Sequence, residues 1–341
     1  MIACSTSWNQ KNHDDIGDAV REILDLGFDG VELSHGLHAT DIDKLLKLRE
    51  RLEFRVSSLH CFCPAPPESR TGNPNSYQFT SHRPSVRDRA VTLVNRTIDT
   101  ARQFGARCVV VHAGSIHTMK VAPGLLKLLE AGKLFNKQYA KTKLDAVLAR
   151  EKKIELYMRR VLDCLAPIAE HAATCNVLVG IENRQDFEEM PAEWEFEEMF
   201  RRLDAPHVGY WHDFGHAQIK HNLGFIDHAQ WLDRIGSRTF GAHVHDVQWP
   251  VKDHLAPFTG EVRFATLVPK LPGDADFVFE MTRSVAATDV ATALTRWRRM
   301  SSHSGESGKS GESGESNDFC ARRAPASFDF PDFPDSPDNS Q

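Results

Sequence analysis

The feature that most constrains the fold is one local pattern that recurs between residues 2 and 280. Apolar residues spaced as on one face of a helix precede a glycine or polar break, and a short apolar segment follows. Ile16, Val20 and Ile23, for example, precede a break at Gly27 and the apolar segment 30–33. Eight such apolar segments occur, at residues 2–5, 30–33, 56–60, 108–112, 177–182, 208–213, 240–245 and 277–280.

Helices that alternate with short apolar strands are typical of a parallel sheet, and eight repeats favour a closed barrel over an open sheet. The alternative is a doubly wound open sheet. However, no glycine-rich phosphate loop follows any of the strands. We therefore predict a protein of the α/β class, a single (β/α)8 TIM barrel that spans residues 1–300.

Two segments fall outside the repeat. Residues 115–153 are rich in lysine and leucine, and we expect a helical insertion after the fourth strand, beside the barrel mouth. Residues 301–341 begin with a Ser/Gly/Glu-rich tract and end in Phe-Pro-Asp repeats. Such a low-complexity composition buries too little apolar surface to offset the entropy of ordering, so the sequence predicts a disordered tail.

Charge and composition limit the classes of function. The net charge of −6 is concentrated after Ser301, which leaves the predicted barrel at −1. A nearly neutral barrel argues against a general electrostatic grip on nucleic acid. No apolar stretch is long enough to span a membrane, the start lacks the pattern of a secretory signal, and the seven cysteines fit reduced thiols. We therefore expect a cytoplasmic enzyme.

Ionisable residues sit where the predicted strands end. In a parallel barrel, catalytic groups project from the carboxyl ends of the strands. Burial of carboxylates without partners is costly, so several that converge require a cation. The strand-end residues are Glu32, His60, His112, Glu182, Asp213, His243 with His245, and Glu280.

Three carboxylates and an imidazole form a ligand set that suits one divalent ion such as Mn²⁺, Mg²⁺ or Zn²⁺. Cysteine is absent from this set, which argues against a closed structural zinc site. Strand alternation places His243 and His245 on the same face and does not choose between them as ligands. The same alternation points His212 away from the barrel interior, which indicates a structural role, and Glu32 fits either a structural or a substrate-binding role.

The chain resembles the xylose isomerase-like barrel superfamily, through several motifs whose order matches across the eight strands. The resemblance covers residues 1–300 apart from the insertion. The motifs are residues 27–33 (GFDGVEL), 58–60 (SLH), 110–114 (VVHAG), 180–183 (GIEN), 212–217 (HDFGHA), 243–246 (HVHD) and 259–262 (TGEV).

This resemblance implies one divalent metal ion held by Glu182, Asp213, His243 and Glu280, because the family's His-x-x-Asp pattern selects His243 over His245. It also implies that Glu182 and Glu280 are catalytic and exchange a substrate proton. The remaining polar groups are expected to contact substrate, namely His60, His112, His216, His245 and Glu32. The chain departs from its relatives in three ways: His245 stands where lysine is frequent, the segment between Glu182 and Asp213 is acidic, and the insertion is long.

The function expected from this resemblance is a metal-dependent isomerase or epimerase. It would abstract a proton next to the carbonyl of a sugar or sugar derivative through a metal-stabilised enediolate. A keto-inositol-type dehydratase and a non-catalytic sugar-binding barrel are alternatives. The expected partner is a small sugar, with neither membrane nor nucleic acid, and a homo-oligomer is compatible with this interpretation.

An abasic-site DNA endonuclease of the same superfamily is a further alternative. It uses three zinc ions, and its extra ligands resemble His60, His112 and His216. That family also needs an Asp-x-His pair, whereas Asp253 and His254 are adjacent here. Residues 253 and 254 therefore do not match the Asp-x-His spacing of the endonucleases.

Overall fold

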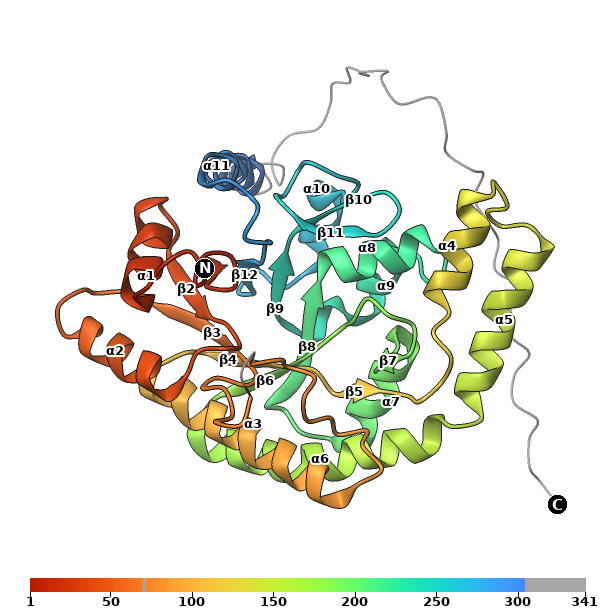
Figure 1. Cartoon of the computed structure of the whole chain (residues 1–341), viewed down its shortest axis with the longest axis horizontal. Coiled ribbons are helices and arrows are strands. Elements are labelled where there is room, and N and C mark those ends of the chain that lie inside the picture. The colour runs from red at the N-terminus through yellow and green to blue at the C-terminus, as the bar shows by residue number, and fades with distance from the viewer. Residues whose placement is uncertain (70–71, 304–341) are drawn as a thin grey trace.

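Eight parallel strands close into a barrel surrounded by helices (Figure 1), in a computed structural model that describes residues 1–69 and 72–303. The strand order around the barrel is β1-β12-β9-β8-β6-β4-β3-β2. This closed sheet confirms the predicted TIM barrel. The barrel strands are β1 (Ile2–Ser5), β2 (Gly30–Leu33), β3 (Val56–His60), β4 (Cys108–Val111), β6 (Leu178–Glu182), β8 (Val208–Asp213), β9 (Thr239–Val244) and β12 (Asp276–Phe279).

Helices cover the outside of the barrel and begin and end at residues suited to those positions. The side chain of Asp15 caps α1 by accepting a hydrogen bond from the backbone of Gly17, and α3 ends at Gly105, whose φ of 62° favours glycine. The helices outside the insertion are α1 (Ile16–Asp25), α2 (Ala39–Arg49), α3 (Pro84–Phe104), α6 (Ile154–Cys175), α7 (Glu193–Leu203), α8 (Phe214–Asn222), α9 (His228–Ile235), α10 (Phe264–Leu267) and α11 (Ala287–His303).

Short elements complete the loops between barrel strands and helices. Four of these elements are short strands that form two small antiparallel sheets, β5 with β7 and β10 with β11. The short elements are β5 (Gly114–Ser115), β7 (Glu189–Met190), β10 (Asp246–Gln248), β11 (Lys252–Leu255), η1 (Gly236–Arg238) and η2 (Val268–Lys270).

The segment predicted as a helical insertion contains α4 (Ala122–Glu130) and α5 (Lys137–Glu151), which lie beside the barrel (Figure 1). Tyr139 of α5 is fully buried, and its hydroxyl donates a hydrogen bond to the carbonyl of Leu223 after α8. Among the described residues, no helix has the length and apolarity needed to cross a membrane. The predicted disordered tail falls, from residue 304 onward, outside the described residues.

The barrel interior is filled beneath the mouth by a tryptophan. Trp211 of β8 packs with Ala3, Cys108 and other buried strand residues. A Cβ atom on Gly180 would lie 3.0 Å from Trp211 Cβ, and one on Gly241 would collide with the indole ring. Glycine at these strand positions therefore makes room for the ring, which forms the floor of the site described next.

Candidate metal and substrate site

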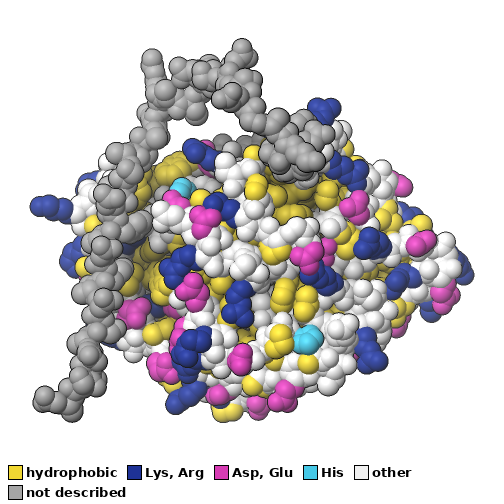
Figure 2. Space-filling model, turned by 180° about the vertical axis from the view of Figure 1, so that it is seen from behind, with side chains coloured by type: hydrophobic (Ala, Val, Ile, Leu, Met, Phe, Trp, Pro, Cys, Tyr) yellow, Lys and Arg dark blue, Asp and Glu magenta, His cyan; other side chains and the backbone are white. Residues whose placement is uncertain are grey.

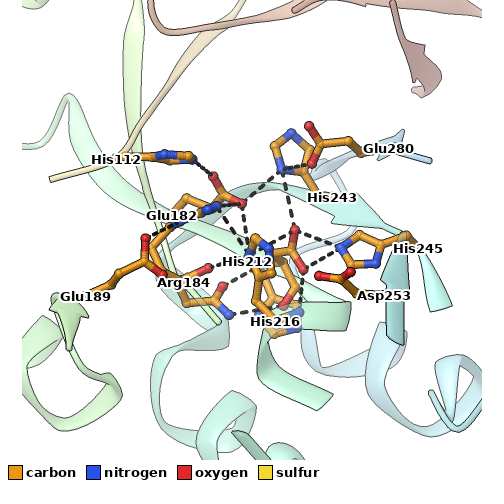
Figure 3. Close-up of polar contacts among 12 residues, drawn as sticks. His112, Glu182, Arg184, Glu189, His212, His216, His243, His245, Asp253 and Glu280 are labelled. Atoms are coloured by element: carbon orange, nitrogen blue, oxygen red, sulfur yellow. Dashed lines mark hydrogen bonds and ion pairs between the residues drawn. The ribbon is translucent and has the colours of Figure 1, made fainter. Parts of the chain in front are cut away.

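The predicted strand-end residues point into the barrel mouth because they share the inward parity of their strands. Trp211 and Asp213 alternate with outward-facing residues along β8, as side chains do on any strand. The four predicted ligands come together: donor atoms of Glu182, Asp213, His243 and Glu280 all lie within 4.8 Å of one another. Figure 3 shows Glu182, His243 and Glu280 among these contacts. All four side chains are buried.

Glu182 is the most connected residue of this group. Its Oε2 atom lies 2.7 Å from His112 Nε2 and 3.4 Å from His60 Nε2. Its Oε1 atom accepts a hydrogen bond from Arg184 Nη1 at 3.0 Å and lies 3.3 Å from His216 Nδ1. One carboxylate thus joins three of the histidines expected to bind substrate, of which Figure 3 shows His112 and His216.

His243 lies between carboxylates from three other strands. Its Nδ1 atom is 3.3 Å from both Glu182 Oε1 and Glu280 Oε2, and its Nε2 atom is 3.2 Å from Glu32 Oε2. The hydroxyl of Ser58 donates to the same Glu32 oxygen at 2.7 Å. Glu32 therefore contacts the Nε2 atom of the imidazole, whereas Nδ1 faces Glu182 and Glu280. This contact favours a role for Glu32 in positioning His243.

Asp213 is held by hydrogen bonds from its own helix and from the neighbouring strand. Its Oδ1 atom accepts from the backbone of His216 at 2.7 Å, which makes Asp213 the N-cap of α8. Its backbone N–H donates to Asn183 Oδ1, and Asn183 Nδ2 donates back to the Asp213 carbonyl. His245 Nε2 lies 3.0 Å from Asp213 Oδ1. These bonds fix the carboxylate of Asp213 beside the other ligands.

The electrostatics keep the carboxylates ionised despite their burial. Burial alone would raise the pKa of Glu182, but the nearby Arg184 and His112 hold that pKa well below its usual range. Burial is likewise outweighed at Glu280, where His243 lowers the pKa to about 2. Burial would lower the pKa of His243, yet Glu280 and Glu32 raise it well above the ordinary value. The buried carboxylates therefore stay negatively charged because cationic groups lie beside them.

The residues present fit a divalent cation. Three ionised carboxylates and one imidazole offer the oxygen-rich set that Mn²⁺, Mg²⁺ or Zn²⁺ accepts, and none of the four donors is a sulfur atom. Glu32 Oε1 is also buried without a hydrogen-bond partner, so this corner of the site keeps one carboxylate oxygen available as an acceptor. Glu182, Asp213, His243 and Glu280 would hold the ion.

The structure brings to the site a histidine, His254, that does not stand at a predicted strand end. The hairpin of β10 and β11 folds back, so the His254 ring stacks on His245 with centroids 4.1 Å apart. The backbone N–H of His254 donates to His245 Nδ1 at 2.9 Å. Donor atoms of His216, His245 and His254 lie within 4.8 Å of one another. His254 has a left-handed backbone with φ of 53°, a conformation that is infrequent outside glycine and that occurs at functional sites.

The structure adds one further residue whose sequence signal was weak. Arg184 follows the end of β6 by two residues. Its guanidinium contacts both Glu182 and Glu189, and its side chain is only 12% exposed. No local pattern distinguishes this arginine from a surface arginine. Its ion pair with Glu189 depends on the folded chain, because β7 places Glu189 beside the mouth.

A closed parallel barrel with a buried cluster of carboxylates and histidines at its carboxyl-terminal mouth defines a class of α/β barrel protein whose mouth residues suit a divalent cation. A family model described as the xylose isomerase-like TIM barrel matches residues 20–299. The chain therefore belongs to this family, which confirms the resemblance found in the sequence. No curated protein sequence matches the chain.

Several solved structures share the fold at low sequence identity. A D-tagatose 3-epimerase-like protein is 19% identical with a TM-score of 0.64, over 90% of this chain and 98% of that one. The 3-keto-D-glucoside 4-epimerase of E. coli is 16% identical with a TM-score of 0.62, over 87% and 98%. The IOLI protein with a binding zinc atom is 12% identical with a TM-score of 0.61, over 89% and 98%.

Proposed function

We propose that this protein is a divalent-metal-dependent isomerase or epimerase that acts on a sugar or sugar derivative. The observation that carries the proposal is the convergence of Glu182, Asp213, His243 and Glu280 at the barrel mouth. Two further findings support it: solved structures with this fold include sugar epimerases, and one contains a zinc atom.

The proposed reaction uses the two glutamates as proton carriers. One glutamate removes a proton from the carbon next to the substrate carbonyl, and the electron pair of the broken C–H bond forms an enediolate. Return of a proton to the opposite face of that carbon gives an epimer, and return to the neighbouring carbon gives an isomer. A bound divalent ion would supply positive charge beside the carbonyl oxygen. Glu182 and Glu280 suit these roles because they approach His243 from two different strands.

The remaining polar groups of the mouth suit substrate binding. His60, His112, His216 and His245 present imidazole nitrogens next to Glu182 and Asp213, within reach of sugar hydroxyl groups. The Nδ1 atom of His112 lies 2.9 Å from Asn75 Oδ1, which orients the ring toward Glu182. Trp211 closes the space beneath, and its ring packs edge-on against His243 at a centroid distance of 5.2 Å.

The test is a screen of ketoses, keto-inositols and sugar acids in D2O with protein loaded with Mn²⁺, Mg²⁺ or Zn²⁺. We expect deuterium to enter one substrate beside its carbonyl, together with formation of an epimer or isomer, and chelation of the metal to abolish both. Loss of water from the product would instead indicate the dehydratase. Sugar binding without deuterium uptake would indicate a non-catalytic barrel.

A specific observation also favours a second function, cleavage of DNA at abasic sites. Two further groups of donors flank the main group, namely His60 with His112 and Glu182, and His216 with His245 and His254. The loop that breaks the expected Asp-x-His spacing nevertheless brings His254 into the site. Three adjacent groups are what a three-metal centre requires.

Metal content and DNA cleavage separate the two functions. The isomerase predicts one ion per chain in the barrel mouth and no cleavage of an abasic-site duplex. The endonuclease predicts three ions there and efficient cleavage. The predicted barrel has a net charge of only −1, and the face shown in Figure 2 carries interspersed charges of both signs. The low net charge favours the first function, because phosphate contacts supply much of the affinity for DNA.

A further inference from the structure

A second cluster of metal-ligating side chains lies on the outer surface of the barrel, where α3 packs against α6. Asp99 projects from α3, and His171 and Cys175 project from one face of α6, one helical turn apart. His171 Nε2 lies 2.8 Å from Asp99 Oδ1, and Cys175 Sγ lies 3.8 Å from that oxygen and 3.7 Å from the imidazole nitrogen.

We propose that Asp99, His171 and Cys175 form a zinc-binding site that ties α3 to α6. Zinc bonds of about 2.0–2.3 Å to nitrogen, oxygen and sulfur separate tetrahedral donors by roughly 3.3–3.6 Å. The two distances from Cys175 Sγ are close to this spacing already. Only the hydrogen-bonded pair of His171 and Asp99 has to open, by about half an ångström, to admit the ion.

The chemistry of the three donors selects zinc over Mg²⁺ and Mn²⁺, two of the ions that suit the barrel mouth. A thiolate, an imidazole and a carboxylate are a mixed soft set, which disfavours Mg²⁺ and Mn²⁺. The side chains of His171 and Asp99 are 32% and 55% exposed, and Cys175 is partly buried. The fourth position of the ion is therefore open to water or to a donor from another molecule. This exposure also gives the ion a path to the site.

The cluster is independent of the proposed reaction. Cys175 ends α6, and β6 begins three residues later at Leu178 and carries Glu182 at its other end, so the two sites lie at opposite ends of that strand. A metal ion here would take no part in proton transfer. It would instead cross-link the final turns of two neighbouring barrel helices, as structural zinc ions do when they bridge separate segments.

Cobalt substitution tests the site in the whole protein, because Co²⁺ bound to a thiolate gives an intense near-ultraviolet charge-transfer band. None of the residues that gather at the barrel mouth donates sulfur, so this band reports the surface site alone. We expect the native protein to develop the band on titration with Co²⁺, and Zn²⁺ to displace it. Cys175→Ser should abolish the band and lower the bound metal by one equivalent, with unchanged deuterium uptake in the sugar assay.

Two companion variants make the result decisive. His171→Ala keeps the thiol and should weaken cobalt binding at least tenfold. Cys320→Ser removes a cysteine outside the described residues and should leave the band intact. A native protein that binds cobalt without the band would refute the site, and so would a band that persists in Cys175→Ser. Neither outcome depends on whether the barrel proves to be an isomerase.

Discussion

The imidazoles of His212 and His228 face each other through their Nε2 atoms, 3.1 Å apart, in a buried position outside the barrel wall. The Nδ1 atom of His212 lies 2.9 Å from the hydroxyl of Tyr210, and that of His228 lies 3.4 Å from Gln218 Oε1. A hydrogen bond between two Nε2 atoms needs one donor and one acceptor, so the accepting ring is neutral, and burial favours the neutral form of the donating ring as well. The outward direction expected for His212 from strand alternation agrees with these contacts.

This pair predicts a loss of stability in acid. Burial lowers the pKa of His212 to about 3, and burial with the neighbouring His212 lowers the pKa of His228 well below its usual value. In the unfolded chain both rings titrate near pH 6.5. Between about pH 6.5 and 3 the unfolded state therefore binds protons that the folded state excludes, and the free energy of unfolding falls as the pH falls.

We expect His228→Gln to flatten this pH dependence by up to about 1.4 kcal/mol per pH unit, because it removes one such histidine. Urea unfolding at several pH values from 7 to 4 measures the slope, which is separate from any constant loss of stability in the variant. His82→Gln, at an exposed histidine, is the control and should keep the native slope. Parallel slopes for native protein and His228→Gln would contradict the assignment of neutral rings.

The two proposed proton carriers predict a second result. Glu182→Gln and Glu280→Gln should each lower deuterium uptake into the substrate by about 10²–10⁴-fold, because an amide cannot accept the proton. Part of the metal should remain bound, since three of the four ligands are unchanged in each variant. Glu198→Gln, on the exposed face of α7, is the matched control and should leave both uptake and metal content as in the native protein. Near-native turnover in either site variant would refute the proton-transfer roles.

The barrel and the inward direction of its strand-end residues could be predicted because strand alternation is a local property of sequence. The parity that turns Asp213 inward also turns His212 outward, and both positions agree with the structure. His254 could not be predicted in the same way. It reaches the site through an irregular hairpin, where the register shifts between Asp246 and Gln248. The spacing of apolar residues in the sequence does not indicate that this hairpin folds back to the mouth.

The contacts of the long insertion could not be predicted from the sequence either. Its lysine and leucine content predicted helices but gave no sign that Arg150 of α5 is 1% exposed. The guanidinium donates two hydrogen bonds to the carboxylate of Glu195, at 2.6 and 2.7 Å, and one each to the carbonyls of Phe187 and Glu189. These partners lie 37 to 45 residues away in sequence, so only the folded chain brings them together. The ion pair between Arg150 and Glu195 therefore connects α5 of the insertion to α7.

Breaking the pair should be costly. We expect Arg150→Met to reduce the free energy of unfolding by about 3–5 kcal/mol, because Glu195 is left charged and buried without its partner. Adding Glu195→Gln should recover part of that loss, since a neutral amide can still accept the hydrogen bond from the backbone of Ala192. Urea unfolding of the two single variants and the double variant gives the coupling energy. Additive losses would show that the two side chains do not act as a pair.

Gly215 in the first turn of α8 allows His245 to approach Asp213. A Cβ atom at this position would collide with the imidazole of His245, although alanine is the better helix former by about 1 kcal/mol. We therefore expect Gly215→Ala to leave the fold intact while it displaces His245, and to lower deuterium uptake at least tenfold. Thermal unfolding and the uptake assay measure the two effects separately. Gly124→Ala is the matched control, because a Cβ there meets only Thr142 Cγ2, at 3.9 Å, within α4 and α5. That variant should keep native uptake, and an equally active Gly215→Ala would show that the position of His245 does not matter for the reaction.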